Sequence, residues 1–158
     1  RGQAGRKGID FSQGTLEIGK ALSPPVIREV RKHAADDGLT IIDCPPGTSC
    51  PMSTAVSGTD YVVLVTEPTP FGLHDLTLAV ETVRKMELPC GVVINRSTNG
   101  DGRVQKYCAK QDIPVLMEIP EDRKIAEGYS RGVPLVECAN EYRSAFEKLP
   151  ELIKRSLS

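Results

Sequence analysis

Short apolar segments and helix-like segments alternate along most of this chain, and this alternation is the strongest constraint on its fold. The segment 61–66 is continuously apolar, which is typical of parallel strands buried on both faces. Alternating strands and helices need crossover connections, which make the strands parallel and cover both faces of the sheet. We therefore predict an α/β fold, a mainly parallel sheet with helices on both faces. The predicted strands are 14–19, 39–43, 61–66, 90–95 and 113–119.

The predicted helices follow serine, threonine, asparagine and proline start signals. Gly38 is expected to end the first helix. Pro150 is expected to kink or split the last one, because proline lacks the N–H that a helix interior needs. These helices are predicted to begin at Ser23, Pro51, Thr69, Arg103 and Asn140.

Composition indicates an ordinary globular protein. Residues 1–158 are predicted to form a single domain, with 1–13 as a flexible lead-in. Hydrophobic residues make up 39% of the chain and charged residues 26%, which argues against disorder. The net charge of -1 and the absence of Trp argue against nucleic-acid binding, and no apolar run is long enough for a membrane span. Five cysteines without a C-x-x-C pair favour reduced thiols and a cytoplasmic location.

One predicted strand ends in residues that suit phosphate chemistry. The run from Ile41 to Pro51 is a strand pattern that ends at Asp43 and continues into a loop with Gly47. An aspartate in this position often holds a phosphate-bound Mg²⁺, and a glycine N–H can approach a phosphate closely. The segment resembles the Walker B and switch II region of P-loop ATPases. The partner motif G-x-x-x-x-G-K-[ST] does not occur in the 158 residues, so we interpret the chain as part of an ATPase whose phosphate cradle lies elsewhere.

Three further strand ends carry polar or turn-forming residues. Parallel strands end at a common edge of their sheet, where such folds bind ligands. We therefore expect these ends to open with Asp43 on one crevice. Any single end could equally be an ordinary cap or turn, so it is their convergence that indicates a site. The three ends are 66–68, 95–96 and 119–122.

Two longer motifs together resemble the MinD/ParA/Mrp group of ATPases, and most closely the branch with an inserted ferredoxin domain. The resemblance implies a MinD-like P-loop NTPase fold and a dimer that binds ATP and Mg²⁺. It runs from about residue 14 to residue 136, although the ferredoxin cysteine run C-x₂-C-x₂-C-x₃-C-P is absent from this chain. The matching motifs are Asp43-Cys44-Pro45-Pro46-Gly47-Thr48-Ser49-Cys50-Pro51 and Thr66-Glu67-Pro68-Thr69-Pro70-Phe71-Gly72-Leu73-His74-Asp75, continued by 95–96 and 119–127.

The resemblance implies a role for each matching residue. Asp43 would hold Mg²⁺ through a water, and the Gly47 N–H would sense the γ-phosphate, which makes these two the catalytic residues. The segment 45–49 would then be a switch loop. The Asn95 amide would hydrogen-bond the adenine edge, since an amide offers both donors and an acceptor. For Arg96, a nucleotide contact and an ordinary solvated arginine stay equally open. On the opposite side of the adenine base from Asn95, the wall of the pocket would come from Pro120, Glu121 and Asp122.

Cys50 has two interpretations. In the nitrogenase iron protein, a relative of this group, a cluster-ligating cysteine follows the switch II aspartate at a similar spacing. The resemblance therefore implies that two copies of the chain could share a 4Fe–4S cluster through Cys50. Alternatively, Cys50 is a switch-loop thiol that packs or reacts. Because it lies at a predicted helix start, we expect it to be the most reactive of the five thiols.

Two functions follow from these observations. The first is the ATP-binding and switch portion of a MinD-type ATPase, a homodimer coupled through a partner protein to iron–sulfur or redox chemistry. Without a phosphate loop, this chain alone is expected to hydrolyse ATP poorly or not at all. The alternative is a non-catalytic α/β interaction module that uses the switch loop and Cys50 for a partner protein or an iron–sulfur cluster.

The missing phosphate loop also has a structural consequence. In the family, the strand before that loop lies between the strands predicted at 39–43 and 61–66. We therefore expect no direct pairing of these two strands. The sheet should instead have a gap that further chain fills, or a bare edge that causes self-association, because unpaired strand edges attract other strands.

Overall fold

The computed structural model describes residues 9–16, 23–34, 37–97 and 100–157. The chain divides into two compact units, Arg1–Gly58 and Thr59–Ser158, and each is described here by itself. The single domain expected from chain length stays a prediction. Of the expected lead-in, residues 1–8 lie outside the described residues, and residues 9–13 have no regular secondary structure.

Among its described residues, the first unit contains two helices, α1 (Ser23–Arg31) and α2 (Cys50–Val56). The helix start predicted at Ser23 is confirmed, but α1 ends at Arg31, well before Gly38. The Arg31 guanidinium donates a hydrogen bond of 2.9 Å to the carbonyl of Thr54 and so ties α1 to α2. The buried side chains of α2 are Met52, Ala55 and Val56.

The strand predicted at 39–43 is wrong, because this segment has no regular secondary structure. A strand exists only where a neighbouring strand completes its ladder of hydrogen bonds. No described residue pairs with this segment, and its apolar side chains are left in solvent, with Leu39 72% and Ile41 84% exposed. Of the strand predicted at 14–19, residues 14–16 are irregular and residues 17–19 lie outside the described residues.

The second unit is built on a parallel sheet, as predicted. Its strands among the described residues are β1 (Val62–Thr66), β2 (Cys90–Asn95) and β3 (Val115–Ile119), in the order β1-β2-β3. Thr66 is paired with Ile94, and Asn95 is paired with Ile119. The three strands therefore end at one edge of the sheet.

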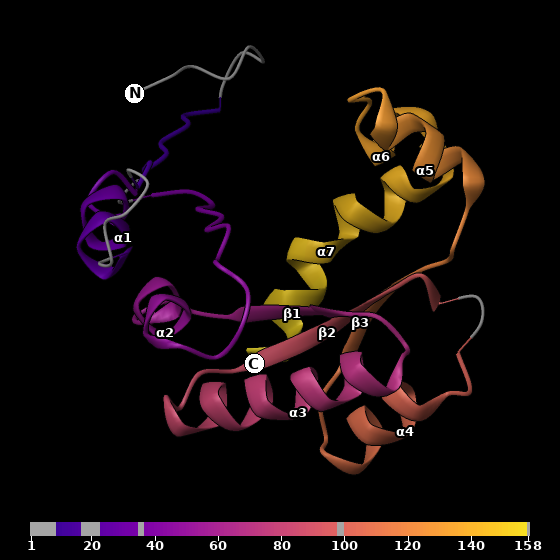
Figure 1. Cartoon of the computed structure of the whole chain (residues 1–158), viewed down its shortest axis with the longest axis horizontal. Helices are drawn as coiled ribbons and strands as arrows, with labels where there is room; N and C mark the ends of the chain where they lie inside the picture. Colours follow the sequence, from indigo (N-terminus) through magenta and orange to yellow (C-terminus); the bar gives the residue numbers. More distant parts are fainter. Residues whose placement is uncertain (1–8, 17–22, 35–36, 98–99, 158) are drawn as a thin grey trace. The chain divides into compact units, whose positions relative to one another are not determined.

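Helices cover both faces of this sheet, which confirms the predicted α/β architecture. The helices α3 (Pro70–Lys85) and α4 (Arg103–Lys110) lie on one face, and α7 (Arg143–Ser156) lies on the other (Figure 1). On the α3 side the buried residues include Leu76, Val80 and Val83. On the α7 side, apolar side chains of α7 pack against buried residues of β2 and β3. That core contains Val93, Leu116, Met117 and Ile119, with Phe146, Leu149, Leu152 and Ile153 of α7 packed against them.

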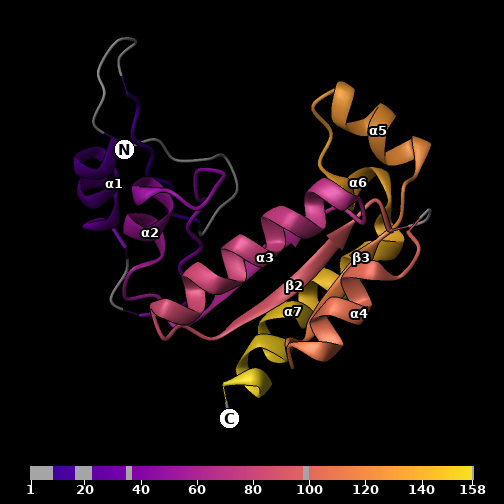
Figure 2. The ribbon, with the colours of Figure 1, turned by 60° about the horizontal axis from the view of Figure 1, so that its bottom comes forward.

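The end of the chain differs in detail from the sequence predictions. Two short helices, α5 (Arg123–Ser130) and α6 (Leu135–Cys138), were not predicted, and they lie beyond the carboxyl ends of the strands (Figure 2). Asn140 begins a short 3-10 turn, η2 (Asn140–Tyr142), rather than the closing helix itself. The helix α7 continues through Pro150 and is not split there, because residues on both sides of the proline pack on the sheet.

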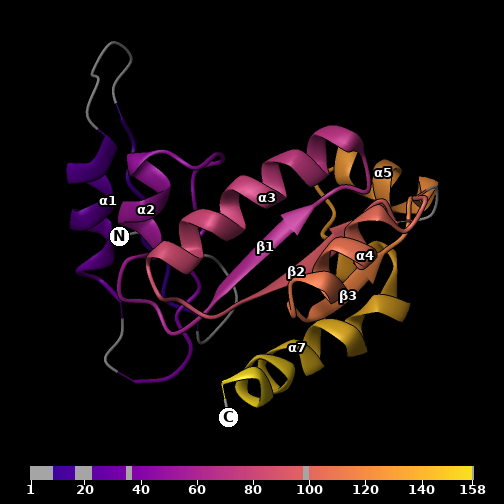
Figure 3. The ribbon, with the colours of Figure 1, turned by 90° about the horizontal axis from the view of Figure 1, so that it is seen from below.

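The strand β1 is incompletely covered. Along it, Val62, Leu64 and Thr66 are buried beneath α3, whereas Val63 and Val65 are exposed, Val65 by 67%. Val65 is paired with Val93 and therefore lies on the face of the sheet that α7 covers farther along (Figure 3). Within the described residues, β1 pairs only with β2, so its outer edge is open. The expectation that 39–43 and this strand do not pair, and that further chain or self-association satisfies the edge, stays a prediction.

Candidate functional site

The carboxyl edge of the sheet brings together two groups of residues that the sequence predicted for nucleotide binding. Asn95, the last residue of β2, is paired with Ile119, the last residue of β3. The chain then leaves β3 at Pro120, beside Asn95 in the neighbouring strand. An amide and an adjacent proline turn offer a base both hydrogen-bonding groups and an apolar wall. Their role toward a nucleotide stays a prediction.

Asp122 has a structural function that is visible without any ligand. Its carboxylate accepts a hydrogen bond of 2.7 Å from the Lys124 N–H and thereby caps the start of α5. This bond satisfies one of the backbone donors that every helix start leaves open. The turn from Pro120 to Asp122 is therefore anchored at both ends, by β3 and by α5.

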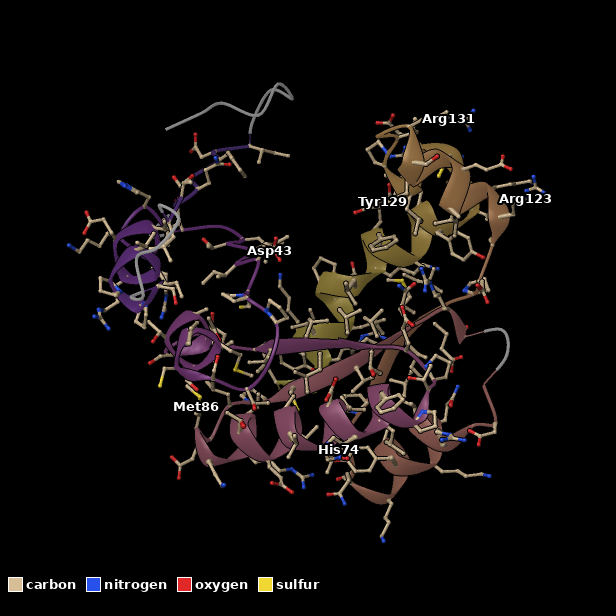
Figure 4. The ribbon with its side chains drawn as sticks, viewed as in Figure 1. Asp43, His74, Met86, Arg123, Tyr129 and Arg131 are labelled. Atoms are coloured by element: carbon tan, nitrogen blue, oxygen red, sulfur yellow. The ribbon has the colours of Figure 1, made fainter. Side chains whose placement is uncertain are left out.

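Asp43 and Gly47 belong to the first unit. Asp43 is exposed on the irregular stretch before α2 (Figure 4). Gly47 has a φ of 92°, a backbone conformation that residues with a side chain rarely adopt, so the bend of this loop depends on glycine. Burial raises the pKa of the neighbouring Cys44 thiol, and the charge of Asp43 raises it further. The predicted crevice shared by Asp43 and Asn95 stays a prediction.

Cys50 is an exposed free thiol at the first position of α2. Ser49 is the cap residue of this helix, and Pro51 follows the thiol. Within the ranges that the structure describes, no three His, Cys, Asp or Glu side chains gather into a group that could hold a metal ion. The role of Cys50 as an iron–sulfur ligand stays a prediction.

The junction between β1 and α3 is tightly built. The buried Thr66 hydroxyl donates a hydrogen bond of 2.9 Å to the Gly72 carbonyl. The Thr69 hydroxyl accepts one of 2.9 Å from the Gly72 N–H, which confirms Thr69 as the cap of α3. A Cβ on Gly72 would overlap the carbonyl oxygen of Glu67. Only glycine therefore allows the start of α3 to lie this close to the end of β1.

An ion pair that sequence reasoning did not find joins two of the strand ends. The Arg96 guanidinium lies 3.4 Å from the Glu67 carboxylate. Arg96 also has a φ of 53°, which is unusual for a residue with a side chain. The register could have suggested the pair. Because Thr66 is paired with Ile94, residues just beyond these positions follow neighbouring strand ends, and they carry opposite charges.

Two aromatic side chains on helices that follow strand ends are turned to solvent. Phe71 is 83% exposed in the first turn of α3. Tyr129, which is labelled in Figure 4, is 84% exposed on α5. Large exposed aromatic residues are typical of surfaces that bind other proteins. In the part of the chain that the structure describes, no helix is long and apolar enough to cross a membrane.

Comparison with known proteins identifies relatives. The family model described as NUBPL iron-transfer P-loop NTPase matches residues 26–155. An uncharacterized protein of Methanocaldococcus jannaschii is 29% identical over 150 residues, which cover 90% of this chain and 52% of that protein. An iron-sulfur cluster carrier protein of Pyrococcus horikoshii is 30% identical over 134 residues, which cover 72% of this chain and 45% of that protein.

A second iron-sulfur cluster carrier protein, from Rickettsia bellii, is 31% identical over 101 residues, which cover 61% of this chain and 32% of that protein. The chain spans about half the length, or less, of these curated relatives. The family match confirms the resemblance to the MinD/ParA/Mrp group of P-loop ATPases that the strand-end motifs predicted.

Proposed function

Because the chain belongs to the NUBPL iron-transfer P-loop NTPase family, we propose that it is the base-binding and switch portion of an ATPase that handles iron–sulfur clusters. The observation that carries this proposal is the register of β2 and β3, in which Asn95 is paired with Ile119. That pairing sets an amide beside the turn that begins at Pro120. In a parallel α/β sheet, this edge is where ligands bind.

The adenine base would lie between Asn95 and the turn 120–122. The amide oxygen of Asn95 would accept a hydrogen bond from the amino group of adenine, and the amide nitrogen would donate one to a ring nitrogen. Pro120 would contribute an apolar surface against the ring. The cap bond from Lys124 to Asp122 would keep this turn in place while the base enters and leaves.

The phosphates and Mg²⁺ would be served by the loop of the first unit. Mg²⁺ prefers oxygen ligands and keeps several waters, and an exposed carboxylate such as Asp43 suits it through a bridging water. The Gly47 backbone can offer its N–H to a γ-phosphate because no side chain stands in the way. Bound Mg-ATP would supply the phosphoryl group, while Asp43 and Gly47 hold and sense it.

The open edge of β1 is an argument that a further strand and helix lie beside this unit in the proposed ATPase. Val63 and Val65 are exposed on one face of β1, and its outer edge has no partner among the described residues. A strand pairing with this edge, followed by a helix over the two valines, would cover both. In the proposed ATPase this neighbour carries the phosphate loop and its lysine, so this chain alone should turn over ATP poorly.

The iron–sulfur cluster is proposed as cargo of a homodimer. Two copies of the chain would each contribute the exposed Cys50 thiol, and the cluster would pass from there to a recipient protein. Two relatives are named iron-sulfur cluster carrier proteins, which supports this cargo. The exposed aromatic residues Phe71 and Tyr129 offer a surface for the recipient.

The ATPase proposal is tested in a polypeptide that joins this chain to its phosphate loop. Asp43→Asn should lower Mg-ATP turnover at least about tenfold, as is typical when an outer-shell metal partner is lost. Asp37→Asn is the matched control, because Asp37 is an exposed aspartate of the same unit outside the switch loop. Equal turnover for both variants would contradict the role of Asp43.

The cargo proposal has a separate test. After anaerobic reconstitution with iron and sulfide, Cys50→Ser should abolish cluster binding to the dimer, whereas the half-buried Cys90→Ser should retain it. Retained iron in Cys50→Ser would exclude Cys50 as a ligand. Cluster binding without any ATP turnover would favour the alternative function, a non-catalytic interaction module.

A further inference from the structure

We propose that Glu67 is a positioning residue for the adenine subsite, because its ion pair with Arg96 holds the backbone turn that directly follows Asn95. This inference rests on the proposed function, in which Asn95 reads the base. Glu67 belongs to the end of β1 and Arg96 follows β2, so the pair spans two neighbouring strand ends at 3.4 Å.

The backbone of Arg96 needs such support. Its φ of 53° lies in the left-handed region, where a side chain crowds the following carbonyl. Residues in this region persist when the surrounding structure holds them, and they are concentrated at ligand sites. Without an anchor, Arg96 would relax toward an extended conformation, which would change the course of the backbone directly after Asn95.

The structure supplies a rigid anchor. The Glu67 carbonyl accepts a hydrogen bond of 2.8 Å from the Thr69 N–H, and Gly72 packs against the same carbonyl. The preceding residue, Thr66, is held by its buried hydroxyl. The Glu67 carboxylate therefore extends from a fixed point, and its partner on the next strand is restrained with it.

A second contact confirms that the loop after β2 rests on the end of β1. A Cβ on Gly100 would lie 2.7 Å from the Cβ of Pro68, so the two backbones approach closely. The Gly100 N–H also donates a hydrogen bond of 3.5 Å to the Ser97 carbonyl. Two described residues after β2 therefore contact the β1 end, Arg96 through Glu67 and Gly100 through Pro68.

Fixing this turn matters for which base is recognised. An unrestrained amide can turn over and present either its oxygen or its nitrogen, so it would accept adenine and hypoxanthine nearly alike. Adenine offers a donor at the position where hypoxanthine offers an acceptor. By fixing the backbone from which the Asn95 side chain extends, the ion pair is proposed to bring the amide to the base in one placement, which favours adenine. The ion pair thereby sets specificity rather than stability, since its side chains are 42% and 61% exposed and exposed pairs contribute little to folding.

The test compares AMP with IMP on the 158-residue chain by NMR titration, because these nucleotides share ribose and phosphate and differ in the base. The wild-type chain should bind AMP at least about fivefold more tightly than IMP, the lower end expected for a bidentate amide contact. Glu67→Gln should reduce that preference about two- to fivefold, the scale of an exposed ion pair. The charge-reversed double variant Glu67→Arg with Arg96→Glu should restore it.

Glu29→Gln is the matched control, because Glu29 forms an exposed ion pair with Lys32 at 2.8 Å in the other unit. It should leave the AMP preference unchanged, and circular dichroism should show all variants folded. The role of Glu67 alone would be overturned if Glu67→Gln left the AMP preference of the wild type unaltered. It would also be overturned if the charge-reversed double variant did not restore that preference. A wild-type chain without any AMP preference would overturn the base-binding proposal on which this inference depends.

Discussion

Gly72→Ala offers a direct test of the junction between β1 and α3, because two physical effects predict opposite results. Alanine is a better helix former than glycine by about 1 kcal/mol, so helix propensity alone predicts stabilisation. Sterics predict the reverse. The new Cβ would overlap the Glu67 carbonyl oxygen and lie 3.1 Å from the Thr66 hydroxyl oxygen and 3.2 Å from the Glu67 carbonyl carbon.

The magnitude follows from what must move. The obstruction is backbone in a turn and cannot rotate away, so the first turn of α3 has to lift. Lifting weakens the Thr66 bond to the Gly72 carbonyl and the Thr69 cap, each worth about 1 kcal/mol. Overpacking adds about 1–3 kcal/mol, and helix propensity offsets part of it. We expect a net loss of about 2–3 kcal/mol.

Urea unfolding followed by circular dichroism measures this loss as a lower midpoint at unchanged slope. Thr66→Val and Thr69→Ala serve as matched variants, since each removes only one of the two bonds and should cost about 1 kcal/mol. The double variant of Gly72→Ala with Thr66→Val should destabilise by less than the sum of the single variants, because Gly72→Ala already weakens the bond that Thr66→Val removes. A Gly72→Ala chain as stable as the wild type, or additive energies in the double variant, would refute this account of the junction.

Three further predictions concern the surface. Hydrogen bonds from the Arg103 side chain and N–H lower the pKa of Asp101 from 3.8 to about 2. The contribution of this carboxylate to folding stability is therefore complete above its ordinary pKa and is lost as the pH falls through about 2. Arg103→Gln should return the midpoint of the Asp101 titration, followed by NMR, toward 3.8, and an unchanged midpoint would contradict the assignment. Self-association through the open edge of β1 is one of the two outcomes expected for this edge, and Val65→Lys should abolish it in sedimentation velocity, because lysine protects an open strand edge. Undiminished association would mean that another surface is used. Brief alkylation should label exposed Cys50 before Cys108, whose pKa is raised by burial; the reverse order in peptide mapping would count against an accessible Cys50.

Part of the candidate site could be predicted from sequence because it depends on strand ends alone. Apolar runs before Asn95 and Pro120 indicated two parallel strands, and parallel strands end at one edge, so the two positions had to be close. The ion pair of Glu67 with Arg96 could not be predicted in the same way. It depends on the order of β1 and β2 in the sheet and on a left-handed backbone at Arg96, and neither is written in the local residue pattern.

Two similar apolar segments show what the sequence by itself determined and what tertiary structure decided. The sequence identified both 61–66 and 39–43 as strand-forming, and it identified the cap of α3 at Thr69 from local chemistry. Only 61–66 became a strand, as β1, because β2 lies beside it and completes its hydrogen bonds. The segment 39–43 has no such neighbour among the described residues and remains irregular, with Leu39 and Ile41 exposed. Side-chain pattern sets the capacity to form a strand, but backbone N–H and C=O groups need a partner that only the assembled sheet provides.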